Sequence, residues 1–223
     1  MDFEKDRIET SNGELIITFI GHGTLMFSFG GKTIHIDPYS EVADYSKLPK
    51  ADIIFITHEH RDHLDLKAIS HIRAEKTIFI IPKICASQIE QGIVMNNGDS
   101  KDIYNLKIEA VPAYNIVHKR ESGEPFHPKG IGNGYIITFG DKRVYVAGDT
   151  EDIPEMNELK AIDIAFLPMN LPYTMTPEMM ARAAKIIRPK ILYPYHYGET
   201  DLSKLVELMK DSNEIEVRIR KMK

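Results

Sequence analysis

The sequence predicts an α+β fold in which two β-sheets lie face to face between outer helices, a four-layer αββα sandwich. Three observations predict this. Each half of the chain begins with short apolar runs of strand length joined by tight turns. Each half continues with an unbroken apolar run, which is typical of a strand covered on both faces. Helical patterns follow later in each half, where they can cover the outer faces of the sheets.

The first half supplies most of the expected strands. Gly30 and Gly31 predict a hairpin turn between two of them. Helices are expected at 64–74 and at 82–91. The expected strands are 14–21, 24–29, 32–37, 51–57, 76–82 and 106–114.

The second half repeats this order. A hairpin over 134–149, turning at Gly140 and Asp141, precedes a buried strand at 162–168. Thr176 and Pro177 are typical of a helix start, so a helix is expected over 176–188. A strand over 190–198, a helix over 201–210 and an alternating edge strand around Ile215, Val217 and Ile219 complete the chain. The repeated order indicates two related halves, and no segment resembles a linker, so one domain over 1–223 is expected.

Composition narrows the classes of function. The net charge of −5 gives no general attraction to nucleic acid or anionic lipid. Neither an apolar leader at the N-terminus nor an apolar run long enough to span a membrane is present in the sequence, so we expect a cytoplasmic protein. Cys85 is the only cysteine, which excludes an internal disulfide and a thiolate metal cluster and favours a buried small hydrophobe.

The stretch "FITHEHRDHLD", residues 55–65, predicts a metal site. His58, His60, Asp62 and His63 directly follow a buried strand. Polar side chains gathered there would lose hydration without a shared partner, and a metal ion is such a partner. His58 and His60 cannot converge from a helix because side chains two positions apart point in different directions, but an extended or turning segment brings them together. Imidazole and carboxylate ligands favour Zn(II), with Mn(II) or Fe(II) as alternatives.

Further candidate ligands occur at other strand ends. Asp149 ends "VYVAGD" and His196 lies in "LYPYHYG". The irregular segment 115–134, long for a compact domain, offers Asn115, His118 and His127.

Together, "THEHRDHLD", "AGDT" and "PYHYG" resemble the metallo-β-lactamase superfamily over almost the whole chain. "FIGHGT" and "LPYTMTPEMMARAAKIIRPKILYPYHYG" resemble most the branch of ascorbate-phosphate lactonase and the N-acylphosphatidylethanolamine phospholipases D. The resemblance implies an αββα sandwich with the site at one edge between the sheets.

The resemblance also implies two metal ions. One would be held by His58, His60 and a third histidine, the other by Asp62, His63 and His196, and Asp149 would bridge them. The family often has a histidine where this chain has Asn115. His127 is the favoured third histidine, and His118 and Asn115 remain alternatives.

A hydrolase is the expected function. Two bound Zn²⁺ ions would lower the pKa of a shared water to about 7, so that a metal-bound hydroxide could attack an ester, lactone or phosphodiester of a small molecule. Asp149 and Asp62 are the expected catalytic carboxylates, the first by fixing the ions and the second by accepting a proton. The alternatives are a non-catalytic metal-binding module and a nuclease of the same superfamily. Oligomeric state is not indicated.

Five other side chains receive weaker predictions. His35 and His71 are expected to be structural or exposed. His22, between two glycines, is a candidate for orienting a ligand such as Asp37. Lys129 and Tyr173 are candidates for substrate contacts, and surface or packing roles are equally compatible with the pattern.

Overall fold

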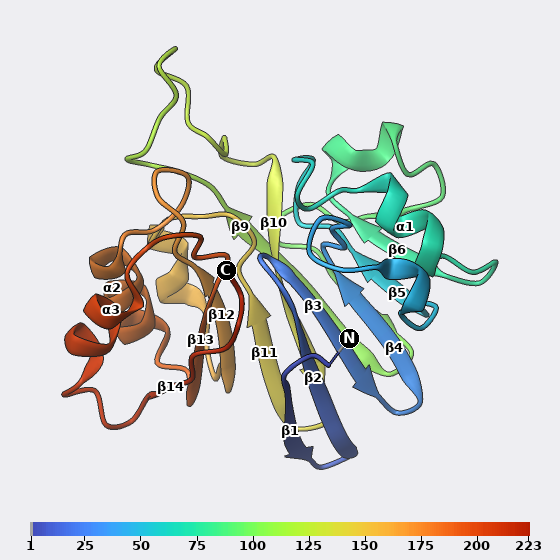
Figure 1. Ribbon diagram of the computed structural model, residues 1–223, viewed down its shortest axis with the longest axis horizontal. Helices are drawn as coiled ribbons and strands as arrows, with labels where there is room; N and C mark the ends of the chain where they lie inside the picture. The colour runs from blue at the N-terminus through green and yellow to red at the C-terminus, as the bar shows by residue number, and fades with distance from the viewer. Residues whose placement is uncertain (1) are drawn as a thin grey trace.

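Two seven-stranded β-sheets form the centre of the molecule in the computed structural model, which describes residues 2–223. The sheets face each other, with α1 (Leu66–Ile72) outside the first and α2 (Pro177–Ile187) and α3 (Leu202–Met209) outside the second (Figure 1). This is the predicted four-layer αββα sandwich.

The first sheet contains its strands in chain order. The first four strands are antiparallel, and the last three join the fourth in parallel. The strands are β1 (Lys5–Thr10), β2 (Gly13–Gly21), β3 (Thr24–Phe29), β4 (Lys32–Ile36), β5 (Ile53–Phe55), β6 (Ile78–Ile81) and β7 (Ile93–Val94).

The second sheet has the same order and the same switch from antiparallel to parallel pairing at its fourth strand. The strands are β8 (Ser100–Ile103), β9 (Leu106–Ala113), β10 (Gly132–Phe139), β11 (Lys142–Val146), β12 (Ile164–Pro168), β13 (Ile191–Tyr195) and β14 (Glu216–Val217). The two halves therefore share one topology, as the repeated order of the sequence predicts.

The sheets are held together by a core of aliphatic and aromatic side chains. Phe27 of β3 packs edge to face on Phe139 of β10, with ring centroids 5.6 Å apart, and Phe55 of β5 packs on Tyr135 of β10 in the same way. Burial of such side chains contributes roughly 1.5–3 kcal/mol each. A rigid core fixes the strand ends from which the site is built.

Helix starts follow the sequence signals. Asp65 accepts hydrogen bonds from the backbone N–H groups of Lys67 and Ala68 and so caps α1. Thr176 caps α2 through the N–H of Met179, with Pro177 in the first turn. Asp65 is thus a cap and not a member of the histidine cluster.

Predictions for five segments were wrong or incomplete. The helix expected at 82–91 is a short 3₁₀ helix over Lys83–Ser87, because the chain must reach β7 within a few residues. The strands β1, β7 and β8 were not predicted. Alternation in β1 is between exposed and half-buried positions, and three of the four residues in β8 are exposed, so neither carries a strong apolar signal. The irregular segment ends earlier than expected, at the start of β10.

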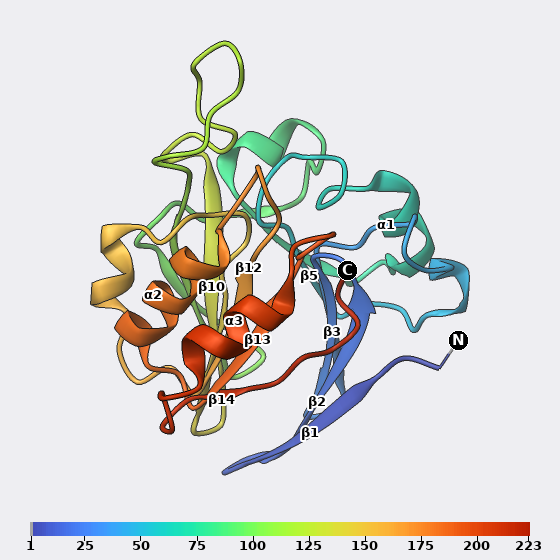
Figure 2. The ribbon, with the colours of Figure 1, turned by 60° about the vertical axis from the view of Figure 1, so that its left-hand side comes forward.

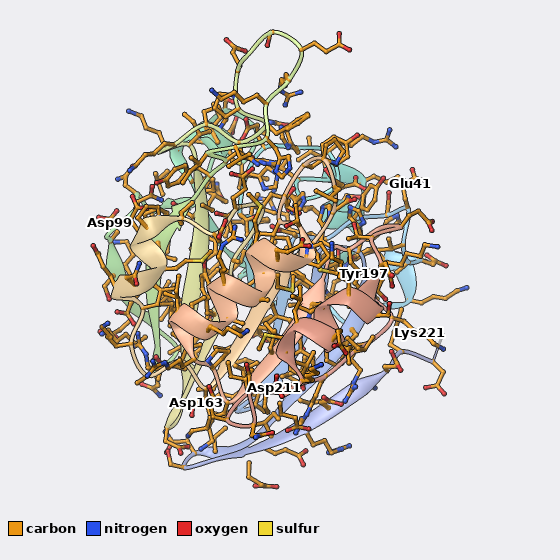
Figure 3. All side chains as sticks on the ribbon, turned by 90° about the vertical axis from the view of Figure 1, so that its left-hand side faces the viewer. Glu41, Asp99, Asp163, Tyr197, Asp211 and Lys221 are labelled. Carbon is orange, nitrogen blue, oxygen red and sulfur yellow. The ribbon has the colours of Figure 1, made fainter. Side chains whose placement is uncertain are left out.

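The surface carries charges of both signs. In Figure 3, Glu41 and Lys221 lie at the edge of the molecule, and Asp211 is also exposed. Within residues 2–223, no helix is long and apolar enough to cross a membrane.

Candidate metal centre

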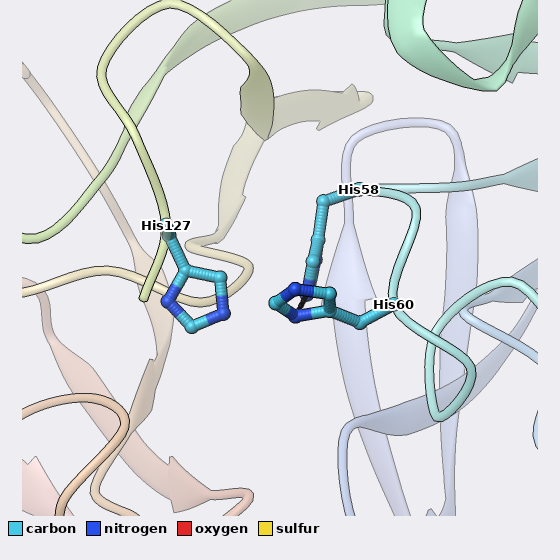
Figure 4. Close-up of side chains that lie close together, drawn as sticks. All are labelled: His58, His60 and His127. Carbon is cyan, nitrogen blue, oxygen red and sulfur yellow. Dashed lines mark hydrogen bonds between the residues drawn. The ribbon is translucent and has the colours of Figure 1, made fainter. Parts of the chain in front are cut away.

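The histidine motif lies at one edge of the two sheets, just after β5. The chain leaves the sheet at Ile56 and turns through residues 57–65 without regular secondary structure, so side chains two apart can point inward together. Figure 4 shows His58 and His60 on this turn facing His127, which comes from the long segment between β9 and β10. Figure 2 shows that segment projecting beyond the sheets.

A first cluster of donor atoms combines three imidazoles and a carboxylate. His58 Nε2 lies 3.1 Å from His60 Nδ1. Asp149 Oδ2 lies 3.2 Å from His127 Nε2 and 3.9 Å from His58 Nε2. The four atoms come from three separate connections of the fold and converge on one point.

A second cluster lies on the other side of Asp149. His63 Nε2 and His196 Nε2 are 3.2 Å apart. Asp149 Oδ1 is 3.6 Å from each of them, and Asp62 Oδ2 is 3.6 Å from the first and 3.3 Å from the second. Tetrahedral Zn²⁺ with bonds of 2.0–2.1 Å would place its ligands about 3.3–3.4 Å apart. These distances match that spacing.

Two buried atoms in these clusters lack hydrogen-bond partners. They are His127 Nε2 and Asp149 Oδ1. Asp149 Oδ2 is close to His127 Nε2, but the pair does not have hydrogen-bond geometry. A buried polar atom without a partner is costly unless an ion completes it. The residues present therefore fit one metal ion in each cluster.

The surrounding hydrogen bonds leave lone pairs facing the clusters. His63 Nδ1 lies 2.8 Å from Asp37 Oδ2 and donates a proton there, so Nε2 is the nitrogen that faces the second cluster. Thr57 Oγ1 donates to the same carboxylate at 2.6 Å and lies 3.0 Å from His58 Nδ1, whose proton it accepts. Such outer contacts fix the tautomer of a metal-binding histidine.

The close packing of these groups shifts their pKa values. Burial lowers the pKa of His58 well below its ordinary value, so the imidazole is neutral and can offer a lone pair. Burial opposes ionisation of Asp149, but the imidazoles of His196 and His63 outweigh it and hold the pKa of this carboxyl well below its usual range. Asp62 behaves likewise, with hydrogen bonds from His196 and His22 overcoming burial to lower its pKa. Both carboxylates are ionised at neutral pH.

Asn115 supports His127 and is not itself at the cluster. Its Oδ1 accepts from the His127 backbone N–H at 3.0 Å and from Nδ1 at 2.6 Å, which leaves Nε2 for the cluster. Its Nδ2 donates to Glu151 Oε1 at 3.0 Å and to the carbonyl of Tyr173 at 2.9 Å.

Glu151 holds the start of the long segment through hydrogen bonds. Its buried carboxylate accepts the backbone N–H groups of residues 116, 117 and 118 at 2.6–2.7 Å. It also accepts His118 Nδ1 at 2.7 Å. Burial acts to raise the pKa of Glu151, but these donors outweigh it and lower the value. His118 is therefore engaged away from the cluster, and of the three alternatives only His127 lies in it.

His22 contacts a different carboxylate from the one we predicted. Its Nε2 lies 3.0 Å from Asp62 Oδ2, not at Asp37, and its ring packs on His196 with centroids 3.7 Å apart. The backbone of His22 is left-handed, with φ 53°. A Cβ on the next residue, Gly23, would lie 2.9 Å from His63 Cε1 and 3.1 Å from His196 Cδ2, so only glycine fits beside the second cluster.

A cavity of about 540 Å³ opens above both clusters. Tyr173 lines it, whereas Lys129 pairs with Glu155 at 2.7 Å and stacks on Tyr114, outside the cavity. A substrate contact of Tyr173 stays a prediction. Sequence reasoning missed its other polar side chains, because an isolated arginine or asparagine in a loop carries no motif. The lining residues with that character are Arg61, Arg120 and Asn170.

Three remaining predictions concern residues away from the clusters. Cys85 is fully buried, as expected, and burial raises the pKa of its thiol to about 12. His35 is buried in the sheet with Nε2 3.2 Å from the carbonyl of Pro49, and His71 is exposed on α1.

Comparison with known proteins decides the family. Residues 16–196 match the model of the beta-lactamase superfamily domain. The chain belongs to this superfamily. A UPF0173 metal-dependent hydrolase of Methanopyrus kandleri is 32% identical over 193 residues, covering 82% of this chain and 84% of the relative. The relatives place the chain among the metal-dependent hydrolases of the beta-lactamase superfamily.

Solved structures agree with this membership. A candidate metal-dependent hydrolase from Parabacteroides distasonis is 52% identical, with a TM-score of 0.95 and complete coverage of both chains. Igni18, a metallo hydrolase from the archaeon Ignicoccus hospitalis, is 28% identical with a TM-score of 0.77, covering 93% of this chain and 95% of its own.

Proposed function

We propose that this beta-lactamase superfamily member is a dinuclear metal-dependent hydrolase of a small-molecule ester, lactone or phosphodiester. The two oxygens of Asp149 carry the proposal. Oδ2 faces the cluster of His58, His60 and His127, and Oδ1 faces the cluster of His63 and His196. A carboxylate shared in this way would fix the separation of two ions.

The ligands follow from the clusters. One ion would be held by His58, His60 and His127, and a second by Asp62, His63 and His196, with Asp149 common to both. Donor sets of imidazole and carboxylate suit Zn(II), and Mn(II) or Fe(II) are the alternatives to be tested. Bound dications would supply Lewis acidity and a water of lowered pKa.

Side chains of the protein would position the attacking water and accept its proton. Asp62 is ionised and faces the cavity, so we assign it the role of proton acceptor from the attacking water. His22 donates to Asp62 Oδ2 and restricts the rotation of that carboxylate. The cavity has the size of small-molecule sites, which occupy about 300–1,000 Å³, and this supports a metabolite rather than a polymer as substrate.

The test combines metal analysis with a hydrolase screen. We expect two transition-metal ions per chain after reconstitution with Zn(II), Mn(II) or Fe(II) in separate samples. Hydrolysis of bis-p-nitrophenyl phosphate, a lactone or a thioester should depend on the metal and stop on chelation. Saturation at 1,000 times the dissociation constant stabilises a fold by about 4 kcal/mol, so chelation should lower the melting temperature. A fully active protein that binds one ion would exclude the dinuclear site, and a loaded protein inactive on all three substrates would favour a non-catalytic metal-binding module.

A further inference from the structure

Arg120 is a charged side chain of the cavity that the metal clusters do not use. It lies on the long segment between β9 and β10, seven residues before His127 in the sequence. We propose that Arg120 and His60 together bind an oxyanion of the substrate, a phosphoryl or carboxylate group next to the scissile bond. The proposal rests on the metal site proposed above.

The backbone around Arg120 is ordered by local contacts. Its N–H donates to the carbonyl of Glu124 at 2.8 Å, and Gly123 donates back to the carbonyl of Arg120 at 2.9 Å. Lys119 and Pro125 form an isolated antiparallel bridge at the base of this turn. The guanidinium is thus carried on a closed turn and not on a free loop.

The guanidinium is aimed at the cavity. It lies over the Phe126 ring, 5.2 Å from the centroid, and Nη2 donates to the Phe126 carbonyl at 3.3 Å. Among residues 2–223, no carboxylate lies within 4.0 Å of it. A guanidinium has five N–H donors and most of these have no protein acceptor.

The contact with His60 changes character once a metal ion binds. Arg120 Nη2 lies 3.4 Å from His60 Nε2. If His60 Nδ1 is a metal ligand, its lone pair is committed and the ring proton must sit on Nε2. Two N–H donors then stand 3.4 Å apart, with no acceptor between them. An oxygen of an anionic substrate would satisfy both.

Arg61 provides a matched comparison on the same cavity. It also lines the cavity, but its Nη2 pairs with Glu41 Oε1 at 2.9 Å. Its charge is already compensated at an exposed position, where such pairs contribute little. The two arginines therefore differ in whether a protein carboxylate already pairs with the guanidinium, which is the feature that the proposal needs.

Aromatic side chains next to Arg120 indicate what accompanies the oxyanion. Phe126 and Tyr173 line the cavity and pack edge to face with centroids 5.1 Å apart. Tyr173 remains exposed. We infer that the organic part of the substrate packs against this pair.

Binding of simple anions tests the proposal without catalysis. Phenylphosphonate, benzoate and neutral benzyl alcohol would be titrated by calorimetry into the metal-loaded wild type, Arg120→Ala, Arg120→Lys and Arg61→Ala. Because a charge-assisted contact is lost, Arg120→Ala should bind one or both anions with about 10- to 100-fold lower affinity. Arg120→Lys should recover only part because it lacks the planar fork, and Arg61→Ala should match the wild type. The anion that responds more identifies the phosphoryl or the carboxylate class. Equal affinities in Arg120→Ala and Arg61→Ala, with unchanged metal content, would overturn the proposal.

Hydrolysis provides the second arm. Three substrates share the p-nitrophenolate leaving group: the neutral p-nitrophenyl acetate, the carboxylate-bearing p-nitrophenyl half-ester of glutaric acid, and the diester bis-p-nitrophenyl phosphate. The ratio of kcat/KM for an anionic substrate to that for the acetate should fall at least about tenfold in Arg120→Ala. An unchanged ratio would contradict the role of Arg120 while leaving the hydrolase intact. Absence of hydrolysis in every protein would instead count against the proposed function, and the calorimetry would still decide the anion site.

Discussion

The two halves of the molecule have the same strand order, yet they use their corresponding carboxylates differently. Asp37 follows β4 and Asp149 follows β11, the fourth strand of each sheet. Both are buried at the edge where the histidines gather. Asp37 accepts the N–H of Thr57 at 2.8 Å, the hydroxyl of Thr57 at 2.6 Å and His63 Nδ1 at 2.8 Å. Asp149 has an oxygen with no hydrogen-bond partner.

This difference shows what makes a strand-end carboxylate available to a metal ion. The position of the carboxylate is not sufficient, because both carboxylates lie beside the clusters. What differs is the number of lone pairs that hydrogen bonds from the protein leave free. Thr57 and His63 supply the donors that satisfy Asp37, whereas one oxygen of Asp149 receives none.

The connections between the second and third strands of the two sheets also differ, in their length. In the first half it is the tight turn containing His22, and in the second half it is the long segment containing His127. Each brings a histidine to one cluster. The short turn has His22 at φ 53°, which contacts Asp62, whereas the long one uses Asn115 and Glu151 to hold its imidazole.

The largest effect is expected when each of the two carboxylates is replaced by an amide. Asp149→Asn should lower kcat/KM at least about 100-fold, a loss of about 3 kcal/mol, because a neutral amide would be a poor ligand for the two metal ions of the proposed site. Asp37→Asn should instead lower the free energy of unfolding of the metal-free protein by about 1–3 kcal/mol, because the new amide faces the His63 donor. Steady-state kinetics of the two metal-loaded variants and denaturant unfolding of the two metal-free variants check this. Equal losses of activity and stability in the two variants would show that the carboxylates do not differ as described.

Much of this arrangement could be predicted from the sequence. Long apolar runs such as 162–168 and the signals at Thr176 and Pro177 lie close to the observed β12 and α2. The histidine motif, Asp149 and His196 could be placed at strand ends before the strands were seen, and the structure brings these side chains together.

The rest depends on tertiary contacts that no local pattern reports. The strand β1 pairs with β2 although its sequence, KDRIET, is mostly polar. The partner of His22 could not be inferred, since Asp37 and Asp62 both lie at the same edge and only the turn geometry separates them. Arg120 reaches the cavity through the fold of a segment without periodicity.

A smaller effect should sharpen the comparison of the two connections. Asn115→Ala removes the acceptor that fixes the His127 tautomer, and losses of this kind lower metal affinity about 10- to 100-fold. His118→Ala is the matched control, because it removes one bond to Glu151 from the same segment but touches neither cluster. Competition with a chromophoric chelator would measure the affinities, and hydrogen exchange would report order in residues 115–131. Similar affinities in the two variants would remove Asn115 from its assigned role.

The smallest effect concerns the place where β1 meets the C-terminal segment beyond β14. Asp6 accepts Arg220 Nε at 3.1 Å and Arg220 Nη2 at 2.8 Å, and Tyr193 also donates to it. Burial acts to raise the pKa of Asp6, but Tyr193, Arg220 and Arg218 outweigh it and lower the value in the fold.

A carboxyl with a lowered folded pKa stabilises the protein above its unfolded pKa of about 3.9, and this contribution is lost as the pH falls through the folded value. Asp6→Asn should therefore lower the melting temperature of the metal-free protein by about 2–4 °C at pH 7, and the difference from wild type should shrink below about pH 4. Glu9→Gln, an exposed change on the same strand, is the control and should shift melting less. Measuring in chelator removes the contribution of the metal clusters, so the difference reports this contact alone. A difference that grew toward low pH would have the wrong sign for a carboxylate held ionised by two arginines.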